Sequence, residues 1–89
     1  MPVYSKNMLQ SAYTVGATEI AVRISKNAYE SAKYNPDYFE YQEKVFTHRI
    51  LAEEVLKILK HSFLQVSVTL DYTPEDSSQG MAVYKFDWS

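Results

Sequence analysis

The sequence predicts an α+β fold in which two N-terminal helices pack on a C-terminal antiparallel β-hairpin. Two patterns lead to this prediction. Apolar residues recur at helical spacing from residue 6 to residue 61, and from residue 64 onward they alternate with polar residues. Helices followed by strands are typical of α+β domains, whose helices cover one face of an antiparallel sheet.

The first helix is predicted over residues 6–33, with Ser5 placed to cap its N-terminus. Charged residues recur every three or four positions, so that opposite charges pair along one face. An apolar stripe lies on another face and consists of Leu9, Tyr13, Ala17, Ile20, Ile24 and Ala28. A strand remains the alternative for residues 6–17, because poor helix formers interrupt the pattern near Gly16.

A second long helix is predicted over residues 35–61. Asn35 followed by Pro36 is a strong start signal, because Asn can cap a helix and Pro suits its first position. The main apolar face comprises Tyr38, Tyr41, Val45, His48, Ala52, Val55, Leu56 and Leu59. Because the link between the two helices is very short, we expect them to form an αα-hairpin.

Two strands are predicted at the C-terminal end, over residues 64–72 and 81–88. The inward positions of the first are Leu64, Val66, Val68, Leu70 and Tyr72, and those of the second are Ala82, Tyr84, Phe86 and Trp88. The polar stretch between them contains Pro74 and Gly80, which are common in turns. The two strands are therefore expected to form an antiparallel hairpin.

A sheet of two strands is marginally stable and leaves both edges unpaired, so something must complete it. Val3 and Tyr4 are one source of a third strand, and a second copy of the chain is the other. The predicted long helix carries a second, narrower apolar stripe of Phe39, Phe46 and Ile50. We therefore expect a homodimer, in which Phe39, Phe46 and Ile50 mediate self-association.

The composition is that of one small folded domain covering residues 1–89. The sequence is 46% hydrophobic and 22% charged, and it contains no cysteine, which excludes disulfides and thiolate zinc sites. No stretch approaches the roughly 18 apolar residues of a membrane span, and no signal peptide pattern begins the chain. We expect a soluble, cytoplasmic protein that has no membrane partner.

The residues that catalysis requires are poorly placed in this sequence. The two histidines, His48 and His61, have no second ligand at metal-binding spacing, and His48 lies on an apolar face. Asp71, Glu75 and Asp76 lack the alternation and glycine of a calcium loop. We therefore expect no enzymatic activity, no metal and no cofactor.

The charge distribution argues against nucleic-acid binding. Nine Lys and Arg residues are outnumbered by eleven Asp and Glu residues, which gives a formal net charge of −2. The basic residues are scattered, and acidic neighbours would cancel the counterion release that drives binding to phosphates.

Tyrosine is the unusual component, with eight residues in 89. Tyr is enriched at interfaces because it joins a rigid apolar ring to a polar hydroxyl. Our leading interpretation is a non-enzymatic interaction protein, such as an inhibitor, adaptor or accessory subunit, that binds a protein partner. The alternative is a small-ligand or nucleotide-binding protein with a Tyr-rich pocket. The candidate binding residues in both cases are Tyr34, Tyr38, Tyr41 and Arg49.

Overall fold

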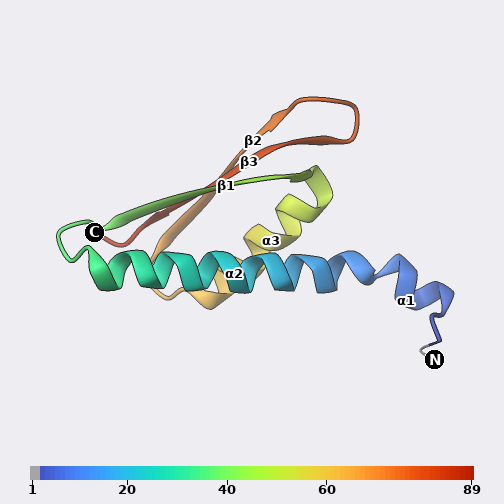
Figure 1. Cartoon of the computed structure of the whole chain (residues 1–89), viewed down its shortest axis with the longest axis horizontal. Helices are drawn as coiled ribbons and strands as arrows, with labels where there is room; N and C mark the ends of the chain where they lie inside the picture. The colour runs from blue at the N-terminus through green and yellow to red at the C-terminus, as the bar shows by residue number, and fades with distance from the viewer. Residues whose placement is uncertain (1–2) are drawn as a thin grey trace.

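The computed structural model describes residues 3–89, and within them it contains three helices and one three-stranded antiparallel sheet (Figure 1). The elements are α1 (Lys6–Gln10), α2 (Ala12–Tyr34), β1 (Glu40–His48), α3 (Arg49–Ser62), β2 (Ser67–Pro74) and β3 (Gln79–Asp87). Residues 1 and 2, which the predicted domain includes, lie outside the described residues. The α+β class is confirmed.

The N-terminal region is helical, so the strand alternative for residues 6–17 is wrong. The side chain of Ser5 caps α1 by accepting a hydrogen bond from the Met8 N–H at 3.2 Å. The break between α1 and α2 lies at Ser11 rather than at Gly16. There the Ser11 hydroxyl donates to the Asn7 carbonyl oxygen at 2.8 Å and competes with the backbone pattern of the helix.

The predicted continuous helix over residues 35–61 is wrong for residues 35–48, because residues 35–39 form a turn and a short link and residues 40–48 form β1. The Asn35-Pro36 pair ends α2 instead of starting a helix. The Asn35 side chain donates to the Ser31 carbonyl oxygen at 2.9 Å, and the residue before a proline is disfavoured in the α region. Because β1 separates α2 from α3, the expected αα-hairpin is replaced by an α2–β1–α3 sequence.

The sheet is completed by β1, from within the chain, and not by Val3 and Tyr4, which lie outside any strand. The strand order is β1-β3-β2, and β3 runs antiparallel to both neighbours. Strands β1 and β2 therefore run in the same direction on either side of β3, with α3 connecting them. This arrangement is a β-α-β unit split by the C-terminal strand.

Helices α2 and α3 pack against each other and cover one face of the sheet (Figure 1). The buried core comprises Ala17, Ala21, Ile24, Ala28, Ala52, Val55, Leu59, Val68, Ala82, Tyr84 and Phe86. The buried Tyr84 hydroxyl donates to the Ala52 carbonyl oxygen at 2.7 Å, which ties β3 to α3. Burial raises the pKa of Tyr84, so its hydroxyl stays protonated as a donor.

The predicted C-terminal hairpin is present as β2 and β3, and the inward positions Val68, Tyr84 and Phe86 are buried as expected. Strand β2 begins at Ser67, however, three residues later than predicted. Leu64 consequently lies outside the strand and is 87% exposed. Over residues 3–89, no helix combines the length and apolar character that crossing a bilayer requires.

Candidate interaction site

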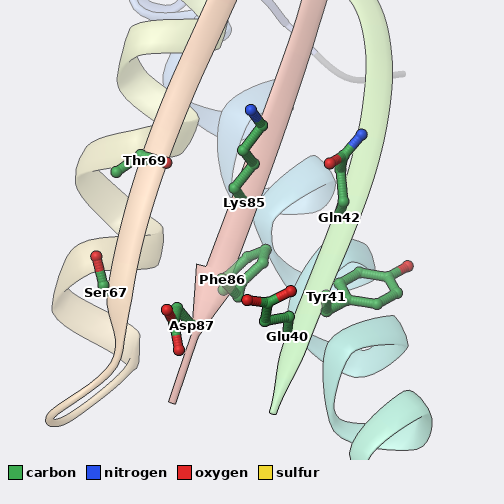
Figure 2. Close-up of a pocket in the computed structure, with 8 residues that line it drawn as sticks. All are labelled: Glu40, Tyr41, Gln42, Ser67, Thr69, Lys85, Phe86 and Asp87. Carbon is green, nitrogen blue, oxygen red and sulfur yellow. The ribbon is translucent and has the colours of Figure 1, made fainter. Parts of the chain in front are cut away.

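The face of the sheet that points away from α2 and α3 carries the outward side chains of all three strands (Figures 1 and 2). The register aligns Glu40, Asp87 and Ser67 in one row, and Gln42, Lys85 and Thr69 in the next. All six side chains are polar, and all of them are exposed. We call this surface the open face.

Figure 2 shows a hollow at the end of the open face nearest the start of β1. It has a volume of about 490 Å³, and the two rows of polar side chains line it. Lys85 lies between Thr69 and Gln42 in this view, and its Nζ is 3.5 Å from Asp71 Oδ2. The hollow can therefore offer hydrogen-bond donors and acceptors together with both signs of charge.

A second hollow, of about 360 Å³, adjoins the first and shares Glu40 with it. Its lining includes Asp37, Tyr38 and Phe39, which precede β1. We call the surface formed by Asp37, Tyr38, Phe39, Glu40 and Asp87 the aromatic-acidic corner. It lies where the N-terminal end of β1 meets the C-terminal end of β3.

Two backbone hydrogen bonds hold the aromatic residues of the corner in place. The Tyr38 N–H donates to the Asn35 carbonyl oxygen at 3.1 Å, which closes a turn after α2. The Trp88 N–H donates to the Phe39 carbonyl oxygen at 3.0 Å, which extends the β1–β3 pairing. Tyr38 is nevertheless 68% exposed and Phe39 is 50% exposed. Both rings are thus presented to solvent by a fixed backbone.

The corner is acidic because it brings together Asp37, Glu40 and Asp87. The described residues 3–89 contain two ion pairs, Lys57–Glu54 and Lys85–Asp71, and neither involves these carboxylates. Hydrogen bonds from the Ser89 hydroxyl and N–H lower the pKa of Asp87 below its usual value of 3.8. Asp87 is therefore negatively charged at neutral pH.

The predicted binding residues Tyr34, Tyr38, Tyr41 and Arg49 are not gathered into one pocket. Tyr34 and Tyr38 are exposed on either side of the turn after α2, whereas Tyr41 is half-buried under the sheet. Arg49 lies beyond the far end of β1, which at about 3.3 Å per residue is about 26 Å long. There its guanidinium stacks on the Tyr72 ring, 5.0 Å from the centroid.

Tyr41 has a structural partner that the sequence did not reveal. Its hydroxyl donates to Glu43 Oε1 at 2.6 Å, and the Asn27 side chain of α2 donates to the same oxygen at 3.0 Å. Partial burial, reinforced by the hydrogen bond to Glu43, raises the pKa of Tyr41 to about 12. This polar contact joins β1 to α2.

The predicted self-association residues Phe39, Phe46 and Ile50 do not form a helical stripe, because β1 occupies the middle of the expected helix. Phe39 belongs to the corner, Phe46 points outward from β1 and Ile50 lies in the first turn of α3. All three are exposed.

The sequence reasoning missed three corner residues, namely Asp37, Glu40 and Asp87. Glu40 and Asp87 lie 47 positions apart and become neighbours only through the β1–β3 register. No pattern along a single segment reveals this pairing, because only the register of the sheet creates it.

The acidic and histidine side chains of residues 3–89 form no group of three or more that could hold a metal ion. His48 is exposed at the end of β1. No family model matches the chain, and neither a curated protein nor a solved structure matches it.

Proposed function

We propose that the chain is a non-enzymatic interaction protein that binds a basic surface of a protein partner through the aromatic-acidic corner. The observation that carries the proposal is the exposure of the Tyr38 and Phe39 rings beside three carboxylates that form no ion pair within residues 3–89. Such a protein acts by occlusion or scaffolding, as an inhibitor, adaptor or accessory subunit does.

The rings of Tyr38 and Phe39 would supply the apolar contact. Aromatic side chains dominate interface energetics because they bury a large area and lose few rotatable bonds. The turn after α2 and the Trp88 hydrogen bond already hold the backbone of both residues. Binding therefore loses little conformational freedom at the anchor residues, and this preorganisation favours affinity.

The carboxylates define the chemistry of the partner. Asp37, Glu40 and Asp87 create a negative potential around the rings, and that potential attracts Lys and Arg side chains. Because the corner is exposed, the attraction is screened by salt. We therefore expect a partner whose docking surface carries basic residues around an apolar centre.

The test begins by recovering partners from an extract of the native host with the full chain and identifying them by mass spectrometry. Each candidate is then purified, and its affinity is measured by calorimetry. We expect each corner to bind one partner molecule. The Kd of this complex should rise at least about tenfold when Tyr38→Ala or Phe39→Ala is introduced. Raising the salt concentration should weaken it further.

Tyr29→Ala is the matched control, because Tyr29 is an equally exposed tyrosine, at 68%, on the outer surface of α2. It should leave the affinity unchanged. Equal losses of affinity for Tyr29→Ala and Tyr38→Ala would contradict the assignment of the binding site to the corner. An affinity that Glu40→Lys leaves unchanged would contradict it as well.

Small-ligand binding is the second candidate function, and the hollow of Figure 2 favours it. Its volume of about 490 Å³ falls in the range of ligand pockets, and Lys85 could hold an anionic group. A thermal-shift screen with nucleotides tests this candidate. A rise in Tm that Lys85→Ala abolishes and Lys26→Ala preserves supports it, and a flat screen counts against it.

A further inference from the structure

The N-terminal arm, which comprises residues 3–15, is a second unusual surface, and it lies at the opposite end of the molecule from the corner (Figure 1). None of the residues of α1 is buried. Six large apolar side chains of the arm are each at least 45% exposed: Val3, Tyr4, Met8, Leu9, Tyr13 and Val15. Apolar side chains thus continue N-terminal to the part of α2 that packs on α3 and the sheet.

The arm is also nearly free of charge. Lys6 is the only charged residue between positions 3 and 18, and the first acidic residue after it is Glu19. Exposed surfaces are normally rich in charged residues, whereas the centres of protein interfaces are depleted in them and enriched in Tyr and Met. The composition of the arm is therefore that of an interface.

The arm has a shape that can receive apolar side chains. At the break around Ser11 it forms a hollow of about 370 Å³, whose lining includes Tyr4, Met8 and Val15. Ala12, Val15 and Glu19 lie along one side of α2 at spacings of three and four, and Met8 of α1 lines the same hollow as Ala12 and Val15.

We infer that this surface is covered by the same surface of a second copy of the chain, with the two arms antiparallel and centred near Ala12. In this arrangement Met8 of each copy packs against Val15 of the other. Lys6 of each copy lies within about one helical turn of Glu19 of the other, so that the two charges bounding the arm are complementary. The inference is independent of the proposed function.

The arm offers a large apolar area to such a pair, because all six side chains are at least 45% exposed. A pair reaches the lower end of stable interfaces when the two arms together bury about 1,200 Å². A heterologous arrangement would leave one apolar surface uncovered, whereas a twofold pair covers both. The expected product is a dimer whose two bodies lie at opposite ends.

Sedimentation equilibrium of the full chain tests the pairing, and Val15→Glu is compared with Val22→Glu. The two valines are 61% and 62% exposed and lie two turns apart on the same side of α2, but only Val15 belongs to the arm. We expect a dimer at tens of micromolar for the wild type and for Val22→Glu, and a monomer for Val15→Glu. Leu9→Glu, in the unburied α1, should also be monomeric.

Disulfide cross-linking then tests whether the two arms are antiparallel. Each variant carries a single cysteine, because the natural chain contains none. Ala12→Cys should form a covalent dimer under mild oxidation. Val22→Cys should not, because the two copies of residue 22 would lie about 30 Å apart along the paired arms at 1.5 Å per residue. In a parallel pair, both variants would cross-link.

A strictly monomeric wild type at high micromolar concentration overturns the inference, and so does a dimer that persists in Val15→Glu and Leu9→Glu. Equal cross-linking of Ala12→Cys and Val22→Cys overturns the antiparallel arrangement. None of these results affects the corner, which is judged by the Tyr38→Ala and Tyr29→Ala affinities. The failure of one proposal is therefore distinguishable from the failure of the other.

Discussion

The two glycines of the chain, Gly16 and Gly80, have surroundings that differ sharply in the room they leave for a side chain. A Cβ atom on Gly80 would meet the Thr73 carbonyl oxygen, and it would lie 2.7 Å from Pro74 Cα. Backbone atoms of a paired strand cannot move aside cheaply. Gly80 is therefore required by the close approach of β2 to β3.

Gly80→Ala should lower the free energy of unfolding by about 1–3 kcal/mol, because the added methyl group overpacks the hairpin. Gly16→Ala is the matched control, since a Cβ atom there would lie 3.9 Å from Leu51 Cδ1, which is an ordinary contact. It should raise the free energy of unfolding by roughly 0.5–1 kcal/mol through helix propensity. Urea denaturation measures both, and effects of the same sign would contradict this account.

Asp76 organises the turn between β2 and β3. Its Oδ1 accepts hydrogen bonds from the Ser78 N–H at 2.8 Å and from the Gln79 N–H at 2.7 Å. These two backbone hydrogen bonds hold the pKa of Asp76 below its usual value of 3.8, and the one from Ser78 has the larger effect. The carboxylate form is thus favoured by the folded turn.

The pH dependence follows from this direction. Because the folded-state pKa is lower than the unfolded one, the stabilisation is fully present above pH 3.8 and is lost as the pH falls through the folded-state pKa. Asp76→Asn should make the free energy of unfolding depend less steeply on pH in this range, because Asn does not titrate although its side-chain oxygen still accepts hydrogen bonds. Urea titrations at several acidic pH values measure the slope, and identical slopes for both proteins would contradict the role of Asp76.

At the scale of elements, β1 shows where the sequence was informative and where it was not. Half of the predicted long helix exists as α3, whose buried residues Ala52, Val55 and Leu59 all lie on the predicted face. Residues 40–48 of the predicted helix form β1 instead. Their alternation of apolar and polar residues is interrupted, because the inward positions include Glu43 and Thr47 while Phe46 points outward, so a helical spacing fitted the sequence better.

The partial burial of Glu43 on the helix-facing side of β1 depends on partners that only the tertiary structure supplies. Asn27 and Tyr41 satisfy its carboxylate, and Asn27 lies 16 positions away on another element. The same limit applies to the corner: Tyr38 was a predicted binding residue, but its proximity to Asp87 follows from the β1–β3 register. Patterns along one segment were readable, whereas pairings between distant segments were not.

A double-mutant cycle of Asn27→Ala and Glu43→Ala tests the placement of β1 against α2. We expect a coupling free energy of about 0.5–1.5 kcal/mol, because each substitution removes the same hydrogen bond. Glu40 is the matched control, since it points outward from the same strand. The coupling between Asn27 and Glu40 should be near zero. A coupling between Asn27 and Glu43 that is equally small would contradict the placement of β1 against α2.

At the scale of the whole molecule, the chain is elongated, with extents of 48 × 31 × 20 Å, and its two unusual surfaces lie at opposite ends (Figure 1). Arm pairing would therefore leave both aromatic-acidic corners free and facing away from each other. A bivalent protein of this shape binds an array of partners more tightly than one copy does.

The Tm should report the same assembly. Binding that is specific to the folded state raises the Tm with protein concentration. We expect this rise for the wild type and for Val22→Glu, and its absence for Val15→Glu, in calorimetric scans over a hundredfold range of concentration. A Tm that is independent of concentration in all three proteins would contradict the dimer.

The central position of β3 also sets the order in which this protein can be completed. Strands β1 and β2 touch each other nowhere in the sheet, so both wait for a partner until the chain has been made as far as residue 87. During translation the helices can form early, but the sheet can close only after its middle member has left the ribosome. A chain whose translation stalls before that point would therefore contain β1 and β2 without β3, the strand with which both of them pair.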